Sequence, residues 1–116
     1  LFRMLVYLSA PYSSVPDKDH LYQSVMRTSG LYMIRNQGAR VVSPLFCVPA
    51  LPLVPEMGSD YNFWGDYSRE LLQKCEKVIV LKYSGWNEST GVKDEIATAL
   101  AANIPVEYLE LSDYQQ

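Results

Sequence analysis

Histidine and cysteine are scarce in this sequence, and their scarcity narrows the chemistry open to it. Among 116 residues there are one histidine and two cysteines. Cys47 and Cys75 form neither a metal-binding spacing nor a disulfide framework, so we expect a cytoplasmic protein with reduced thiols. His20 lies in the first turn of an expected helix without a visible partner, which disfavours a Ser–His–Asp or Cys–His centre. No metal site and no cofactor are expected.

Long apolar runs and excess positive charge are also missing. No segment approaches the roughly 18 to 20 apolar residues of a membrane span. The short apolar start of the chain carries Arg3, so it does not fit a signal peptide either. Lys and Arg total 10 against 13 Asp and Glu, and the net charge of −3 argues against a nucleic-acid partner. With 48% apolar residues, the chain is expected to form one soluble domain over residues 1–116.

Four short apolar runs alternate with helical patterns. The runs cover residues 4–10, 39–44, 77–81 and 104–111 and predict buried strands. Helices are expected from Asp17 to about Gly38, over a middle segment, and from about Gly91 to Asn103. This alternation predicts βαβ units, and therefore one doubly wound (Rossmann- or flavodoxin-like) α/β domain with four or five parallel strands.

Two of the expected helices carry further signals. Gly30, inside the first helix, costs about 1 kcal/mol relative to alanine, so we expect a close packing contact there. Ser59 or Asp60 is a candidate cap for the middle helix. The apolar side chains of that helix recur at four-residue steps and are expected to form its buried face; they are Phe63, Tyr67, Leu71 and Cys75.

Three polar or irregular loops follow the expected strands, at residues 11–16, 44–58 and 83–90. Ligands of parallel sheets bind at the carboxyl ends of the strands, so the site is expected among these loops. The loop 44–58 is long and rich in proline. It is interpreted as a lid or binding loop, with a solvated excursion as the alternative.

Glu95 is the most notable acid of the chain. It falls about one turn into the last helix, at the edge of the apolar face that Val92 and Ile96 define. The helix dipole is expected to keep this carboxylate ionised, which suits a nucleophile or an anionic orienter. Asp94 falls on the outer face and is expected to be solvated. Position alone leaves open whether Glu95 is functional or only a helix-dipole residue.

Other candidate residues have weaker signals. Tyr7 lies near the end of the first strand, where most tyrosines only pack. Ser9, Tyr12 and Ser13 lead into a helix N-terminus, a natural place for an anion such as phosphate, although the loop has no glycine. Asp66 points away from the apolar stripe of its helix, and periodicity alone makes it a solvated acid.

Three segments carry a resemblance to a known family. They are VYLSAPYS (6–13), FWGDYSRELLQKCEKVIVL (63–81) and GWNESTGVKDEIATALAANIPV (85–106). Together they resemble the nucleoside 2-deoxyribosyltransferase-like superfamily, including the deoxyribonucleoside 5′-monophosphate N-glycosidases and small, often phage-encoded relatives. The resemblance covers almost the whole chain, and its last segment is the most specific part.

The resemblance implies roles for individual residues. Glu95 matches the nucleophile that forms a glycosyl-enzyme, and Tyr7 matches the tyrosine that positions this carboxylate. Asp66 matches the aspartate that contacts the base and helps to protonate the leaving nitrogen. Ser89 stands where transferases carry an aspartate and monophosphate hydrolases a serine, and a serine donates to a 5′-phosphate that an aspartate would repel.

The implied activity is hydrolysis of the N-glycosidic bond of a (deoxy)nucleoside 5′-monophosphate, by the two-carboxylate chemistry of retaining glycosidases. Two alternatives remain: 2-deoxyribosyl transfer between bases, and a non-catalytic nucleotide-binding protein. Family likeness also implies a homodimer or higher oligomer. The first loop departs from the family in lacking a glycine. The C-terminal stretch with which transferases complete a neighbour's pocket is expected to be missing or replaced.

The substrate is expected to contact several further side chains. Four aromatic residues are expected to stack on the base: Tyr61, Phe63, Trp64 and Trp86. For Phe63 and Trp64, packing in the core is the alternative. The other candidates for substrate binding are Ser9, Tyr12, Ser13, Ser89 and Gly91.

Overall fold

The computed structural model describes residues 3–47, 53–58 and 61–115, and for Tyr61 the backbone alone. Its centre is a four-stranded sheet in the order β2-β1-β3-β4. All three strand pairs are parallel. The strands are β1 (Met4–Ser9), β2 (Ala39–Val42), β3 (Lys77–Lys82) and β4 (Val106–Glu110). The predicted doubly wound parallel fold is therefore confirmed.

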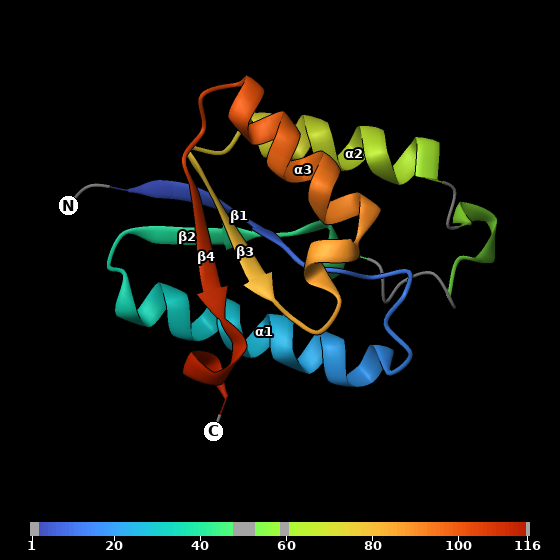
Figure 1. Ribbon diagram of the computed structural model, residues 1–116, viewed down its shortest axis with the longest axis horizontal. Coiled ribbons are helices and arrows are strands. Elements are labelled where there is room, and N and C mark those ends of the chain that lie inside the picture. Colours follow the sequence, from blue (N-terminus) through green and yellow to red (C-terminus); the bar gives the residue numbers. More distant parts are fainter. Residues whose placement is uncertain (1–2, 48–52, 59–60, 116) are drawn as a thin grey trace.

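Helices cover both faces of the sheet (Figure 1). One face carries α1 (Lys18–Arg35), and the other carries α2 (Tyr61–Gln73) and α3 (Thr90–Ala101), which contact each other. Right-handed crossovers between parallel strands produce this three-layer arrangement. Short 3-10 helices lie in the connections: η1 (Pro44–Phe46), η3 (Pro55–Met57), η4 (Trp86–Glu88) and η5 (Leu111–Tyr114).

Alternate side chains of β1 enter two different cores. Val6 and Leu8 join the core on the α1 side, together with Leu21 of that helix. Tyr7 points to the opposite side and joins the core beneath α2 and α3, where Leu72 packs. Because successive strand residues face opposite sides, a tyrosine at position 7 has to lie beneath α2 and α3.

Helix α1 agrees with its expected start but ends earlier. Asp17 caps it, since its carboxylate accepts a hydrogen bond from the backbone N–H of His20 at 3.0 Å. The helix ends at Arg35, and Gly38 lies in the turn before β2 with a φ of 95°. The expected close contact at Gly30 is wrong, because among the described residues a Cβ built there meets no heavy atom within 4 Å apart from its chain neighbours and its own helix backbone.

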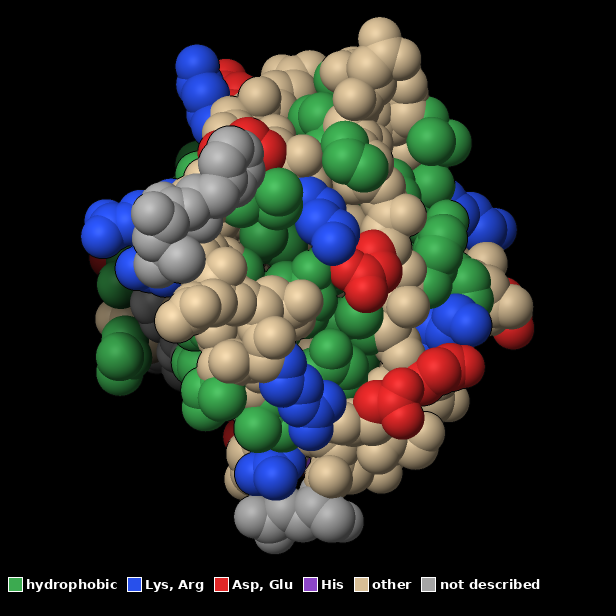
Figure 2. All heavy atoms as spheres, turned by 90° about the vertical axis from the view of Figure 1, so that its left-hand side faces the viewer, with side chains coloured by type: hydrophobic (Ala, Val, Ile, Leu, Met, Phe, Trp, Pro, Cys, Tyr) green, Lys and Arg blue, Asp and Glu red, His purple; other side chains and the backbone are tan. Residues whose placement is uncertain are grey.

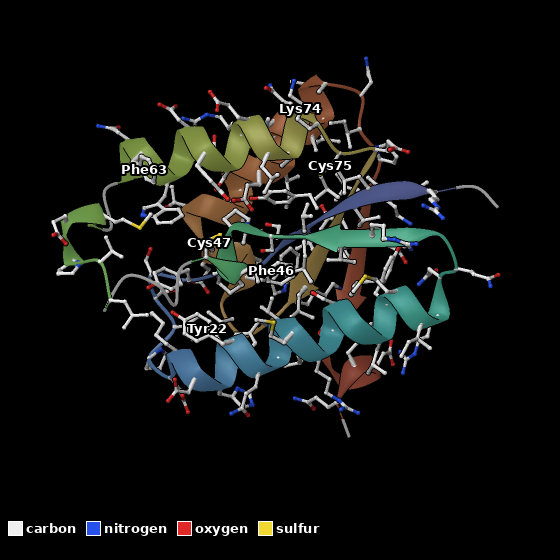
Figure 3. All side chains as sticks on the ribbon, turned by 180° about the vertical axis from the view of Figure 1, so that it is seen from behind. Tyr22, Phe46, Cys47, Phe63, Lys74 and Cys75 are labelled. Atoms are coloured by element: carbon white, nitrogen blue, oxygen red, sulfur yellow. The ribbon has the colours of Figure 1, made fainter. Side chains whose placement is uncertain are left out.

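The buried face of α2 agrees only in part with the predicted one, since Cys75 is buried and Leu71 packs against the core. Phe63 is 48% exposed, whereas Ser68 and Leu72 are buried. The physical reason lies in the aromatic side chains, which pack on one another: Phe63 and Trp64 have ring centroids 5.1 Å apart, and Trp64 and Tyr67 5.5 Å. Figure 3 shows Phe63 at the first turn of α2 and Cys75 beyond its last turn. The candidate caps Ser59 and Asp60 lie outside the described residues.

Charge is mixed at the end of the molecule where β1 begins. Figure 2 shows acidic and basic side chains next to one another on this face, with apolar side chains between them. Among the helices of the described residues, none is both long and apolar enough to cross a membrane.

Candidate functional site

A cleft of about 530 Å³ lies at the carboxyl ends of the central strands. All three loops that the sequence singled out contribute to its lining: Ala10, Tyr12, Ser13 and Ser14 after β1, Ser43, Pro44 and Leu45 after β2, and Glu88, Ser89 and Thr90 after β3. The loops that follow β1 and β2 leave the same edge of the sheet (Figure 1). The strand order changes direction between β1 and β3, and such a switch point opens a crevice for ligands.

Glu95 enters this cleft from α3 and is held from the end of β1. The Ser9 hydroxyl donates a hydrogen bond to its Oε1 over 2.5 Å. Ser9 is 1% exposed and does not line the cleft. Ser9 therefore lies beneath the carboxyl group and orients it, while its contact with substrate stays a prediction.

Desolvation dominates the electrostatics of Glu95. Burial of the carboxyl group raises its pKa from 4.5 to about 7. The hydrogen bond from Ser9 lowers this pKa, the nearby Tyr7 hydroxyl also lowers it, and the charge of Asp94 raises it. Removal from water therefore outweighs the two hydroxyl groups that favour the ionised form, while the contribution of the helix dipole stays a prediction.

Tyr7 brings a second unusual group to the cleft. Its side chain is fully buried, and its hydroxyl has no partner in hydrogen-bond geometry within the described residues. Burial and the Glu95 charge raise the pKa of this phenol well above its usual value, while the Ser68 hydroxyl lowers it. A neutral phenol that lines a cleft without a partner is a donor available to a ligand or to Glu95.

The N-terminus of α3 forms another wall. Ser89 caps the helix and accepts a hydrogen bond from the Val92 N–H at 3.2 Å, which leaves its hydroxyl proton available. Gly91 also lines the cleft, and a Cβ built there would meet only Ser89 Oγ, at 3.9 Å. Unpaired backbone N–H groups at a helix N-terminus favour an anion, so this wall suits a phosphate or carboxylate.

The wall after β1 is polar, with one cation. Tyr12, Ser13 and Lys18 all line the cleft. Lys18 Nζ donates to the Val15 carbonyl oxygen and lies 4.7 Å from the centroid of the Tyr12 ring. Among the described residues, no other Lys or Arg side chain lines the cleft. Sequence reasoning missed Lys18, although its position at the start of a helix beside the anion loop was a usable signal.

Asp66 does not reach the cleft. Its side chain is 73% exposed and pairs with Arg69 at 2.6 Å. The α2 residues that line the cleft are Trp64, Gly65 and Ser68. Gly65, Ser68 and Leu72 recur at three- and four-residue steps, and this pattern could have identified the face that turns to the cleft and the core. The sequence analysis placed the stripe on Phe63, Tyr67, Leu71 and Cys75 instead.

Asp94 lies in the cleft, contrary to its expected place on the outer face of the helix. Arg69 binds its Oδ2 at 2.8 Å, and the Asp94 side chain is 34% exposed. The reason is the position of α2, which packs beside α3 and covers the face that the helical wheel assigned to solvent. The cleft therefore holds Glu95 and Asp94 as carboxyl neighbours.

Trp86 lies outside the cleft. Its ring packs against Tyr108 of β4, with centroids 5.5 Å apart, and Lys82 Nζ lies 5.8 Å from its centroid. It does not line the cleft, whereas Trp64 does. Trp64 Nε1 donates to the Gly58 carbonyl at 3.1 Å, which fixes the ring at the cleft wall. The side chain of Tyr61 is not among the described atoms, so its stacking on a base stays a prediction.

The loop after β2 contributes its first residues to the site. Pro44 and Leu45 are buried and line the cleft. Phe46 and Cys47 lie between α1 and α2 in Figure 3, and Cys47 Sγ is 3.7 Å from Tyr67 Oη of α2. Residues 48–52, in the middle of the predicted lid, lie outside the described residues.

The single histidine has a partner after all. His20 Nδ1 and Tyr83 Oη are 2.6 Å apart, and neither residue lines the cleft. Within residues 3–47, 53–58 and 61–115, no three His, Cys, Asp or Glu side chains gather as metal ligands.

The fold and the cleft define a class: a doubly wound α/β protein with a cleft lined by carboxyl-bearing side chains at the carboxyl edge of its parallel sheet. Within that class, the chain belongs to the family described as Domain of unknown function (DUF1937), whose model matches residues 4–111. No curated protein matches the chain.

Proposed function

We propose that the protein hydrolyses the N-glycosidic bond of a (deoxy)nucleoside 5′-monophosphate, with Glu95 as the nucleophile. The observation that carries this proposal is the Glu95 carboxyl group, which lies in the cleft, is held by Ser9 at 2.5 Å, and neighbours the unpartnered hydroxyl of Tyr7. The likeness to the nucleoside 2-deoxyribosyltransferase-like superfamily supplies the reaction class.

The spacing along α3 fits a nucleotide. Gly91 and Glu95 are four residues apart, so they lie on the same face of the helix, separated by about 6 Å along its axis. A phosphate at the helix N-terminus, bound by the Ser89 hydroxyl and backbone N–H groups, would place the anomeric carbon of the same nucleotide near Glu95. Lys18 supplies a positive charge to the same cleft.

The chemistry proceeds in two displacements. Ionised Glu95 attacks C1′ and forms a glycosyl ester, while the electrons of the C1′–N bond pass to the base, which takes up a proton. Water then attacks C1′, releases the sugar phosphate and restores the carboxylate. With a pKa of about 7, Glu95 is about half ionised at neutral pH and largely ionised only above it, so the first step is expected to slow as the pH falls below about 7.

A second candidate is nucleotide binding without turnover. One observation favours it: Asp66, the residue expected to protonate the base, lies outside the cleft with its side chain 73% exposed. Transfer of 2-deoxyribose to another base remains the alternative fate of the same glycosyl-enzyme.

Release of free base distinguishes these possibilities. The protein is incubated with ribo- and deoxyribonucleoside 5′-monophosphates and the parent nucleosides, with and without an acceptor base, and products are separated by chromatography. We expect base from monophosphates, lost in Glu95→Ala and retained in the control Glu70→Ala, which changes an exposed acid of α2. Wild-type turnover by Glu95→Ala would contradict the mechanism. Binding without base release would favour the binding protein.

The phosphate assignment has its own test. Ser89→Asp places a negative charge at the N-terminus of α3 and should weaken binding of a monophosphate more than binding of its nucleoside. Equal losses for both ligands, measured by titration calorimetry, would remove the phosphate from this wall.

A further inference from the structure

Three charged side chains link the surface of α2 to the cleft. Arg69 donates from Nη2 to Asp66 Oδ1 at 2.6 Å and from Nη1 to Asp94 Oδ2 at 2.8 Å. Asp66 stands at the outer end with its side chain 73% exposed, and Asp94 at the inner end, on the cleft wall. The guanidinium group thus holds one oxygen of the inner carboxylate in a fixed place.

The position of Asp94 relative to the other walls determines what it can contact. Asp94 is adjacent to Glu95 in the sequence and is tied to α2, so it lies on the α2 side of the cleft. Trp64, the aromatic side chain at that wall, also comes from α2. The proposed phosphate wall is at the N-terminus of α3, and from there Asp94 and Glu95 diverge around the helix rather than along it, by about 100° per residue. A nucleotide with its phosphate at that wall and its C1′ at Glu95 would meet Trp64 and Asp94 where its base extends toward α2.

From this arrangement we propose that Asp94 is the specificity-determining carboxylate of the cleft, and that its Oδ1 accepts a hydrogen bond from an exocyclic amino group of the base. Arg69 acts as a positioning residue that holds Oδ2, and Asp66 supports Arg69 from outside. The inference rests on the proposed function for the nucleotide and its orientation. It names the substrate class: nucleotides of amino-bearing bases, such as adenine, cytosine and guanine.

Asp94 has the right position for this contact, on the cleft wall, and Asp66 does not. An ionised carboxylate only accepts hydrogen bonds, so it discriminates in favour of a donor on the ligand. Loss of a hydrogen bond to a charged group typically changes affinity by about 10- to 100-fold. Asp66 is too exposed to supply such a term, because water replaces any contact that it loses.

The test is a set of binding constants for ligand pairs that differ only in one amino group. Suitable pairs are adenosine and purine riboside 5′-monophosphates, guanosine and inosine 5′-monophosphates, and cytidine 5′-monophosphate with its 4-deamino analogue. Titration calorimetry on the Glu95→Ala background prevents turnover. We expect wild-type Asp94 to favour the amino member of at least one pair by about 10- to 100-fold, and Asp94→Asn to reduce that ratio to near unity.

Ratios within a pair separate this contact from general electrostatics. Loss of the Asp94 charge should strengthen binding of every monophosphate, but it does so equally for both members of a pair. Glu88→Gln is the control, because it removes another carboxylate of the cleft lining. The described contacts of Arg69 do not include Glu88, so this variant should keep the affinity ratio within each pair. Arg69→Met should lower the ratio, because Asp94 is then no longer held. Thermal unfolding verifies that each variant is folded, and Asp94→Ala serves as a second variant at the same position.

The outcomes are distinguishable. An amino preference that disappears in both Asp94 variants and persists in Glu88→Gln supports the inference. Three outcomes overturn it while the proposed function stands. They are an amino preference that survives Asp94→Asn, an equal affinity for both members of all pairs, and a choice between ribose and deoxyribose that depends on Asp94. A preference unchanged in Arg69→Met overturns the positioning role. If no nucleotide binds, the inference falls together with the proposed function.

Discussion

Replacement of Glu95 by glutamine should change how the stability of the protein depends on pH. Burial raises the pKa of this carboxyl from 4.5 to about 7, so the native state holds a proton that the unfolded chain releases between these values. The stability contributed by the group is full below pH 4.5 and is lost as the pH rises through about 7. One pKa unit corresponds to about 1.4 kcal/mol, so the loss has an upper limit of about 3 kcal/mol.

Glutamine is neutral at every pH and avoids this loss. The free energy of unfolding of Glu95→Gln, relative to wild type, should therefore rise by up to about 3 kcal/mol between about pH 5 and about pH 8. Urea denaturation at several pH values measures it, and the difference between the two proteins removes the contributions of all other groups. Glu70→Gln, on the exposed side of α2, controls for the loss of a carboxylate as such.

A difference that stays flat across this pH range would refute the reasoning. It would mean that the Glu95 carboxyl is hydrated in the native state, and that Ser9 and Tyr7 orient a group with an ordinary pKa. The measurement needs no ligand, so its result is independent of the proposed reaction. A rising difference would identify Glu95 as a group kept at a cost to stability, which is common at functional sites.

Three further changes test other parts of the structure. Ser9→Ala removes the hydrogen-bond donor to Glu95 Oε1, so the pKa of Glu95 should rise further. The pH below which base release slows should then move to a higher value, and an unchanged pH dependence would contradict the role of Ser9. Gly30→Ala should stabilise the protein by about 0.5–1 kcal/mol in urea denaturation, since a Cβ there meets no described atom within 4 Å outside its own helix, and a loss of stability would show hidden crowding. Thr28→Val should also stabilise, by about 1 kcal/mol, because it removes a buried hydroxyl that has no hydrogen-bond partner among the described residues; destabilisation would reveal a partner such as bound water.

The order of the elements could be predicted because the central strands β1 and β3 are short apolar runs that match a sheet covered on both sides. The run 77–81 agrees with β3 (Lys77–Lys82) to within one residue, and Asp17 signals the start of α1 at Lys18. Such signals are local. Hydrophobic period, caps and breaks depend on the segment itself rather than on what packs against it.

The faces of helices depend on their neighbours, and there the sequence was insufficient. On α2 the aromatic side chains pack on one another, while the small Gly65 and Ser68 face the cleft. On α3 the helical wheel placed Asp94 toward solvent, but Arg69 of α2 lies beside it. The pKa of Glu95 also follows from tertiary packing, because desolvation depends on atoms contributed by β1 and the helices rather than on the dipole of one helix.

The hydrogen bond between the side chains of Ser9 and Glu95 joins residues 86 positions apart in the sequence. Its two ends lie on β1 and α3, so it forms only after β3 has paired with β1 and α3 has crossed back over the sheet. No segment of the chain that ends before α3 can contain the site. A ligand of this cleft would therefore stabilise the whole domain against unfolding rather than one part of it, and its effect on the melting temperature would report the integrity of the complete fold.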